Sequence, residues 1–204
     1  AGAKQVYAAE IDPKVAEFAK KNIVASGYKN IQLFQKNTLE VTQKDIDNQP
    51  VDVVIAENLS TWCVAEPQIQ VMNHINQHLV KTNMICLPSL ILNHIELAQS
   101  QYRFEDLVSL RTHYFQFTGI KSPKILSDKV LFQKIDLRKV NPTSINHEIE
   151  IEVGQDGILN SLRLTSPLEV YQQIRFESSD SLMPPVIVPR SEERRVGKEC
   201  RSRW

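Results

Sequence analysis

Residues 5–27 read QVYAAEIDPKVAEFAKKNIVASG, a short apolar run followed by an amphipathic one. The first part, up to Ile11, is typical of a short strand. Asp12 and Pro13 indicate a helix start, because aspartate can accept hydrogen bonds from the free N–H groups and proline needs none at this position. Gly27 can adopt the left-handed conformation that ends a helix. Between them, apolar residues recur at helical spacing, namely Val15, Phe18, Ala19 and Ile23.

The alternation of strand and helix continues to residue 88. Strands are predicted over 31–35, 51–56 and 84–87, and the middle one, VDVVIA, is apolar enough to be buried on both faces. A second helix is predicted from Pro67, with apolar residues three and four positions apart at Ile69, Met72, Ile75 and Leu79. This order predicts a Rossmann-like α/β domain over residues 1–88, with a mainly parallel sheet.

The pattern changes after Pro88. Strands are predicted over 130–137, 147–153 and 158–164, and the alternation in HEIEIEV predicts one buried and one solvated face. The turn Gln155-Asp156-Gly157 predicts a hairpin between the last two strands. A proline-bounded edge segment, MPPVIVP, follows at 183–189. Residues 89–189 are therefore predicted to form a second, mostly antiparallel β domain.

The composition is that of a soluble globular protein. The 204 residues are 42% hydrophobic and 24% charged, and no apolar run could span a membrane. No start of the signal-peptide type is present. The three cysteines, Cys63, Cys86 and Cys200, are odd in number and lack metal-type spacing, so neither a disulfide framework nor a zinc site is predicted. A cytoplasmic setting without a membrane partner is the expectation.

The two ends of the chain differ from its middle. Residues 190–204, RSEERRVGKECRSRW, closely resemble the in-frame translation of a common DNA-sequencing adaptor and are expected to be a non-native tail. The alternative is a native basic tail that binds nucleic acid. Without its six basic and three acidic residues, 18 basic and 21 acidic residues remain, a net charge of −3. Long nucleic acid is then not a favoured partner. The other end opens directly onto a strand without an initiating Met, which suggests a fragment.

Three glutamates are candidates for chemistry. Glu10 ends the first strand, where a carboxylate can bind both ribose hydroxyls of a nucleotide; a solvated strand end is the alternative. Glu57 directly follows VDVVIA, and Glu66 lies nine positions further. Two carboxylates that bracket a loop at this edge of a sheet could hold a guanidinium and orient it for reaction. Glu66 precedes Pro67, so a role at a helix start is the alternative for that residue.

The remaining candidates are less informative. His74 and His78 have a metal-ligand spacing but no acidic partner, and they are interpreted as surface residues, so no metal site is predicted. Trp62 is interpreted as a packing residue. Cys63 has no neighbouring base and is not proposed as a nucleophile.

Three segments carry a resemblance to a known family. GAKQVYAAEIDP (2–13), NIQLFQKNTLEV (30–41) and VDVVIAENL (51–59) resemble the cofactor half of protein arginine methyltransferases and their shorter prokaryotic relatives, which are class I S-adenosylmethionine-dependent enzymes. The resemblance implies that the N-terminal Rossmann-like domain is incomplete and has lost a glycine-rich cofactor loop, that the second domain is a β-barrel, and that homodimerisation is open. It also implies a set of site residues: Glu57 and Glu66 as the catalytic pair, and Glu10, Ile11, Asn37, Thr38, Leu39 and Glu57 around S-adenosylmethionine.

The resemblance defines the molecule that accepts the methyl group less well, because the sequence departs from the family pattern. Asn58-Leu59-Ser60 stands where the family has Trp-Met-Gly, Leu39 replaces a glutamate that meets the adenine, and residues 178–189 contain no Thr-His-Trp. The expected function is N-methylation of an arginine-like protein site or a small cationic molecule, with the fragment inactive alone. The alternatives are a degenerate methyltransferase-like binding module and an NAD-dependent oxidoreductase.

Overall fold

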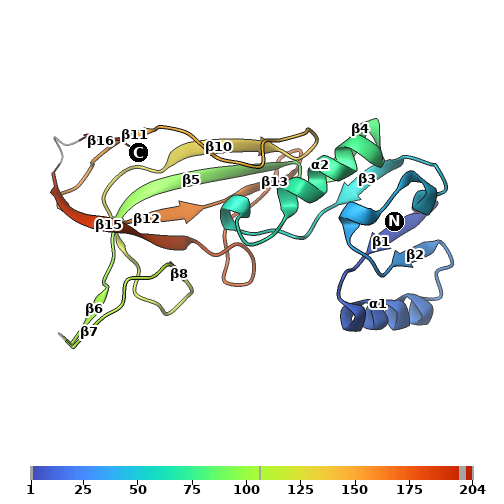
Figure 1. Ribbon diagram of the computed structural model, residues 1–204, viewed down its shortest axis with the longest axis horizontal. Coiled ribbons are helices and arrows are strands. Elements are labelled where there is room, and N and C mark those ends of the chain that lie inside the picture. Colours follow the sequence, from blue (N-terminus) through green and yellow to red (C-terminus); the bar gives the residue numbers. More distant parts are fainter. Residues whose placement is uncertain (1, 106, 198–200, 204) are drawn as a thin grey trace.

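The computed structural model describes residues 2–105, 107–197 and 201–203. It is elongated, with an α/β part at one end and a long antiparallel sheet at the other (Figure 1). In chain order the elements are β1 Val6–Ala9, α1 Pro13–Ser26, β2 Ile31–Phe34, the 3₁₀ turns η1 Thr38–Glu40 and η2 Gln43–Ile46, β3 Val51–Ile55, the turn η3 Thr61–Cys63, α2 Gln68–His78, β4 Val80–Leu87, β5 Leu90–Gln99, β6 Arg103–Phe104, β7 Val108–Ser109, β8 Tyr114–Phe115, β9 Lys124–Ile125, β10 Val130–Asp136, β11 Glu150–Glu152, β12 Gly157–Thr165, β13 Leu168–Tyr171, β14 Ile174–Phe176, β15 Val186–Val196 and β16 Arg201–Arg203.

The first strand and helix have the cap residues that the sequence predicted. Asp12 Oδ1 accepts the N–H groups of Lys14 and Val15 at 2.8 and 3.0 Å, and Gly27 ends α1 with a φ of 73°. The strands on either side of α1, β1 and β2, pair in parallel, and β3 pairs in parallel with β4. The predicted parallel arrangement is confirmed, although the four strands form two separate pairs.

The predicted burial of β3 on both faces is wrong, and the apolar residues of α1 are only partly covered. In α1 Ala16 is buried and Ala19 and Ile23 are half-buried, whereas Val15 and Phe18 are 50% and 67% exposed. In β3 the predicted burial on both faces is found on one face only: Val54 is buried, whereas Ile55 is 77% exposed. An apolar residue is buried only where another element covers it, and the described residues cover one face of this strand.

The second helix agrees with its apolar pattern. Helix α2 begins at Gln68, one residue after the predicted start. All four residues of the predicted apolar stripe are buried, with Met72 fully so, and they belong to a core that β3 and β4 share. The helix therefore covers the buried side of the β3–β4 pair.

The antiparallel part is organised around β5. An eight-stranded sheet has the order β14-β13-β5-β12-β15-β8, and β9 and β10 also pair with β5. The predicted hairpin at Gln155–Gly157 is wrong, because β11 pairs with β16 whereas β12 pairs with β5 and β15. The turn before β12 bonds elsewhere: the N–H groups of Gly154 and Gln155 both donate to the carbonyl of Leu126. The alternation in the 147–153 segment is confirmed, with Ile151 and Val153 buried.

The segment predicted as an edge is paired on both sides at Val186 and Ile187. β15 lies between β12 and the short β8, and it extends past residue 189 to Val196. A register irregularity between Leu159 and Ser161 lies opposite Pro189, which has no N–H to donate to the ladder. The first residues of the expected tail thus continue this strand. Residues 198–200 and 204 of that tail, Cys200 among them, lie outside the described residues.

Two apolar cores hold the molecule together. One is formed by side chains of the antiparallel part. The other joins α2 and β3–β4 to residues of the antiparallel part such as Ile91, Ile135 and Leu137. The predicted fold class, a Rossmann-like part followed by a mostly antiparallel barrel-like part, is confirmed. The domain boundaries stay a prediction. No helix in the described part of the chain is long and apolar enough to cross a membrane.

Candidate functional site

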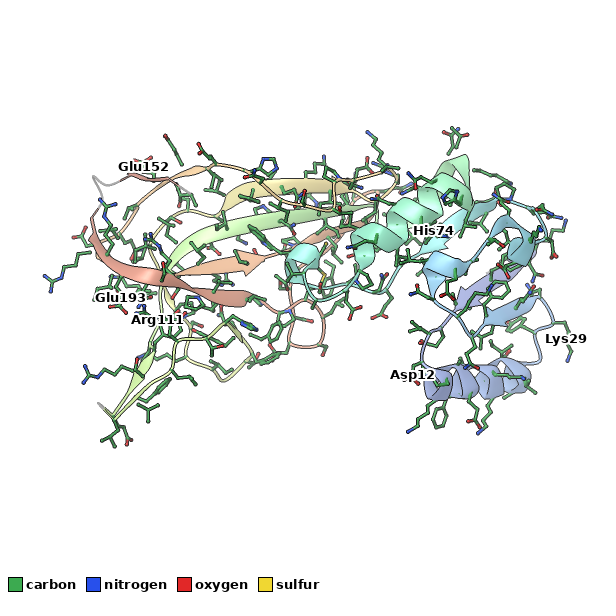
Figure 2. The ribbon with its side chains drawn as sticks, viewed as in Figure 1. Asp12, Lys29, His74, Arg111, Glu152 and Glu193 are labelled. Atoms are coloured by element: carbon green, nitrogen blue, oxygen red, sulfur yellow. The ribbon has the colours of Figure 1, made fainter. Side chains whose placement is uncertain are left out.

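Glu10 follows β1 directly and is half-buried. Its N–H donates to the carbonyl of Phe34 at 3.0 Å, which holds the end of β1 beside the end of β2. Its Oε1 accepts the N–H of Asp12 at 2.8 Å, and within the described residues its second oxygen has no hydrogen bond. Figure 2 shows Asp12 at the start of α1. The carboxylate is thus held by its own loop and keeps one oxygen free to accept.

The segment Asn37-Thr38-Leu39 follows β2 at the same edge of the β1–β2 pair. Asn37 Oδ1 accepts the N–H of Leu39 at 3.0 Å and so shapes the turn η1. The N–H of Thr38 makes no hydrogen bond within the described part of the chain. The structure therefore brings Glu10 and this predicted segment together at the end of two neighbouring parallel strands. Ile11, which follows Glu10, is largely exposed.

Glu57 and Glu66 bracket the connection between β3 and α2, which we name the 57–66 loop. Both side chains are exposed, and no hydrogen bond or ion pair joins either carboxylate to another described residue. The N–H of Glu66 donates to Ser60 Oγ at 3.1 Å, as does the N–H of Ala65. The predicted pair is thus available to solvent at the two ends of one loop, and its action as a clamp stays a prediction.

The middle of the 57–66 loop is attached to the antiparallel sheet. Thr61 Oγ1 donates to the carbonyl of Pro184 at 2.8 Å. The Trp62 N–H donates to Ser166 Oγ at 2.8 Å, and the indole Nε1–H donates to the carbonyl of His94 at 3.1 Å. The Trp62 ring stacks on Phe132 with a centroid distance of 4.7 Å. The interpretation of Trp62 as a packing residue is confirmed.

Sequence reasoning missed Ser60 and Ser166. Ser60 closes the loop by accepting the N–H groups of Ala65 and Glu66, and Ser166 accepts the N–H of Trp62 at the crest of the loop, which is formed by Trp62 and Cys63. Serines are common in connections, and neither serine stands in a distinctive motif. A signal for Ser60 was present, since serine side chains often accept N–H groups of residues that follow in turns. Ser166 is 104 positions away from Trp62, and no local pattern predicts that contact.

Cys63 is not suited to act as a nucleophile. Burial raises the pKa of its thiol to about 11, which disfavours the reactive thiolate at neutral pH. The sulfur lies 3.7 Å from Gln68 Oε1 and acts as a weak donor. The sequence-based rejection of this cysteine therefore agrees with its surroundings.

The two histidines of α2 lie side by side, and one of them contacts the end of η1. His74 Nε2 lies 2.8 Å from the carbonyl of Val41, and its ring is 5.0 Å from that of His78 (Figure 2 labels His74). No group of three potential ligands for a metal ion occurs in the ranges that the structure describes. His74 therefore has a packing role between α2 and the end of η1.

Two cavities lie in the antiparallel part, away from the predicted site residues. The larger, of about 720 Å³, is lined by 99–102 and 120–124 together with residues around β6 and β8. The smaller, of about 310 Å³, lies between 116–122 and 178–180. Neither is lined by the three glutamates, so the candidate site is an exposed region at the ends of strands and lies outside these two cavities.

Comparison with known proteins links the chain to methyltransferases. It matches no protein-family model. It is 28% identical over 188 residues to an uncharacterized protein of Methanocaldococcus jannaschii. This match covers 92% of this chain and 67% of that protein. It is 30% identical over 102 residues to an arginine N(omega)-methyltransferase of Streptomyces achromogenes, and 32% identical over 101 residues to protein arginine N-methyltransferase 7 of Drosophila willistoni. These matches cover 49% of this chain but only 28% and 15% of those two enzymes.

Solved structures show the same fold over nearly the whole chain. The Trypanosoma brucei PRMT1 enzyme–prozyme complex with AdoHcy superimposes with a TM-score of 0.80 at 13% identity, covering 99% of this chain and 70% of that one. Arabidopsis thaliana protein arginine methyltransferase 10 superimposes with a TM-score of 0.75, also at 13% identity, covering 97% and 70%. The chain therefore has the fold of class I S-adenosylmethionine-dependent methyltransferases and resembles the protein arginine methyltransferases in sequence.

Proposed function

We propose that the protein is an S-adenosylmethionine-dependent N-methyltransferase acting on an arginine-like protein site or a small cationic molecule. One observation carries the proposal: two exposed glutamates bracket the loop between β3 and α2, and the middle of this loop is hydrogen-bonded to the antiparallel sheet. The named enzymes among its relatives are arginine methyltransferases, which supports the same reaction class.

The residues at the ends of β1 and β2 fit an adenosyl group. A ribose diol needs a carboxylate acceptor, and Glu10 keeps one oxygen free to accept. An adenine ring nitrogen needs a donor, and the free N–H of Thr38 can supply one. Leu39, which is 39% exposed, can contribute apolar contact to the ring but no hydrogen bond to its amino group. We expect tighter contact with the ribose than with the adenine.

S-adenosylmethionine, held by Glu10 and Thr38, would supply an electrophilic methyl group to the acceptor nitrogen, which would lose a proton to solvent. The role of Glu57 and Glu66 is to hold the positive charge of the acceptor by charge-assisted hydrogen bonds and to orient its nitrogen. Such positioning acts mainly through the geometry of attack, so these residues should affect turnover more than cofactor binding.

The test combines cofactor binding with turnover in the full-length protein. Glu10→Ala should weaken S-adenosylmethionine binding by roughly tenfold or more in calorimetry, because hydrogen bonds to a charged group are worth about 1.5–3 kcal/mol each. Glu57→Gln and Glu66→Gln should each lower kcat for methylation of an arginine-containing peptide by roughly tenfold or more while the cofactor affinity changes little. Transfer of a labelled methyl group from S-adenosylmethionine measures the rate.

Glu17→Gln, at an exposed glutamate of α1 that pairs with Lys21, is the matched control and should leave both quantities unchanged. If Glu66 only supports the start of α2, Glu66→Gln will lower stability slightly and leave kcat nearly intact. Cofactor binding without methylation of any cationic acceptor would favour the alternative of a methyltransferase-like binding module. Unchanged cofactor affinity in Glu10→Ala would contradict the assignment of the ribose contact.

A further inference from the structure

The crest of the 57–66 loop has a backbone conformation that its own residues do not favour. Trp62 has φ 59° and ψ 14°, and Cys63 has φ 55°. Residues other than glycine in this left-handed region carry a strain of about 1–3 kcal/mol, and they persist only where surrounding contacts hold them. Neither residue is glycine or asparagine, so the contacts that hold this crest must be sought outside the loop.

A buried relay of hydrogen bonds meets the crest from the antiparallel sheet. Ser166 Oγ accepts the N–H of Trp62 at 2.8 Å and donates its own hydrogen to Asn93 Oδ1 at 2.7 Å. The Nδ2 of Asn93 in turn donates to Gln133 Oε1 at 3.1 Å. Ser166 is 1% exposed and Asn93 is fully buried, so the central bond of the relay, between Ser166 and Asn93, is shielded from water.

The direction of the relay determines the position of the loop. Because the Ser166 hydroxyl gives its single hydrogen to Asn93, its lone pairs are left to face the Trp62 N–H. Asn93 is fixed on β5 and Ser166 directly follows β12, two paired strands at the centre of the sheet. Two central strands of the sheet therefore support the point of the loop halfway between the two glutamates.

We infer that Ser166 and Asn93 are positioning residues for methyl transfer, which hold the crest of the 57–66 loop so that Glu57 and Glu66 keep a constant separation. This inference rests on the proposed function, but its structural half stands without it. Ser60 accepts the N–H of Glu66, and this bond holds Glu66 in a fixed position relative to the crest.

Hydrogen exchange in the full-length protein tests the structural half. In the wild type the Trp62 amide should exchange slowly. Ser166→Ala removes its acceptor, and exchange in peptides covering 60–66 should accelerate by about tenfold, the factor expected for one lost hydrogen bond, while strands β5 and β12 stay protected. Ser166→Thr keeps the hydroxyl and should restore protection. The matched control is Ser161→Ala, which removes a fully buried hydroxyl from β12 that does not contact the loop.

Kinetics tests the functional half. Ser166→Ala should lower kcat by roughly tenfold with an unchanged dissociation constant for S-adenosylmethionine, and Ser166→Thr should recover most of the rate. A purely structural role would lower the melting temperature and leave kcat per folded molecule unchanged, and that result would overturn the inference while leaving the proposed function intact.

The two proposals fail in different ways. If the wild type transfers no methyl group, the proposed function fails, and exchange alone then judges the relay: faster exchange in Ser166→Ala supports it and unchanged exchange overturns it. If Ser166→Ala does not fold, the wild type still provides a test, because rapid exchange of the Trp62 amide there would contradict a fixed crest.

Discussion

At the scale of single residues, the surroundings of a carboxylate determine what it can do. Glu96 is buried beside Arg163, whose Nη1 donates to Glu96 Oε2 at 2.5 Å, and its role is to pair two strands of the sheet. Within the ranges that the structure describes, only one carboxylate oxygen of Glu10 accepts a hydrogen bond, from the N–H of Asp12. Glu57 and Glu66 are exposed with no partner in the described chain, so of these carboxylates they are the most available to a cationic ligand.

Asp45 gives a prediction about pH. A hydrogen bond from Lys36 at 2.7 Å, with further bonds from the N–H and hydroxyl of Thr42, lowers the pKa of Asp45 from 3.8 to about 2. A carboxyl whose pKa is lower in the folded state stabilises that state above its unfolded pKa. This contribution should therefore be complete above pH 4 to 5 and disappear as the pH falls from about 4 to about 2.

Urea unfolding of wild type and Asp45→Asn at a series of pH values measures this contribution. The difference in unfolding free energy should be constant near neutral pH and should shrink across that acidic window. Lys36→Gln removes the largest cause and should weaken the same pH dependence. A difference that stays constant down to pH 2 would show that Asp45 does not couple folding to protonation.

At the scale of elements, the two helices differ in what holds them. α1 buries only Ala16, whereas α2 buries five residues. The existence and the ends of α1 could be predicted because aspartate, proline and glycine act through bonds within a few residues. The face that α1 presents could not be predicted, because burial depends on which element covers it.

The end cap of α1 should therefore contribute a large share of its local stability. Asp12→Ala leaves the N–H groups of Lys14 and Val15 without their acceptor, and it should destabilise the helix by about 1 kcal/mol. Hydrogen exchange of amides 16–26 should accelerate about fivefold, and Asp12→Asn should retain most of the protection. Glu17→Ala, which removes only an exposed ion pair with Lys21, should have a smaller effect. Equal exchange in wild type and Asp12→Ala would contradict this role of the cap.

At the scale of the whole molecule, α2 is joined to the antiparallel sheet by more than its apolar core. Asn73 Nδ2 donates to the carbonyl of Asn141 at 2.8 Å, and Asn76 Nδ2 donates to the carbonyl of Leu137 at 2.9 Å. Leu137 itself is fully buried in the core that α2 lines. The helix and the sheet should therefore unfold as one unit.

Leu137→Ala tests this coupling. The truncation should lower the unfolding free energy by about 2–5 kcal/mol, because it leaves a cavity in a shared core. Hydrogen exchange during urea unfolding should show α2 and β12 losing protection together, at a lower urea concentration than in the wild type. Val140→Ala, at an exposed position three residues further, should change stability by less than about 0.5 kcal/mol. Loss of protection in α2 before β12 would argue against a single cooperative unit.

Local chemistry along the chain was enough to predict the first βα unit, the parallel strand pairs, the apolar stripe of α2 and the candidate glutamates. These features depend on caps, periodicity and spacing between residues that are near in sequence. The partners of β11, the inner position of β15, the open faces of α1 and β3, and the attachment of Trp62 to Ser166 and Asn93 could not be predicted in this way. They depend on backbone groups and side chains that lie tens of residues apart and meet only when the sheet has formed, because hydrogen bonding and burial act over distance in space and not along the chain.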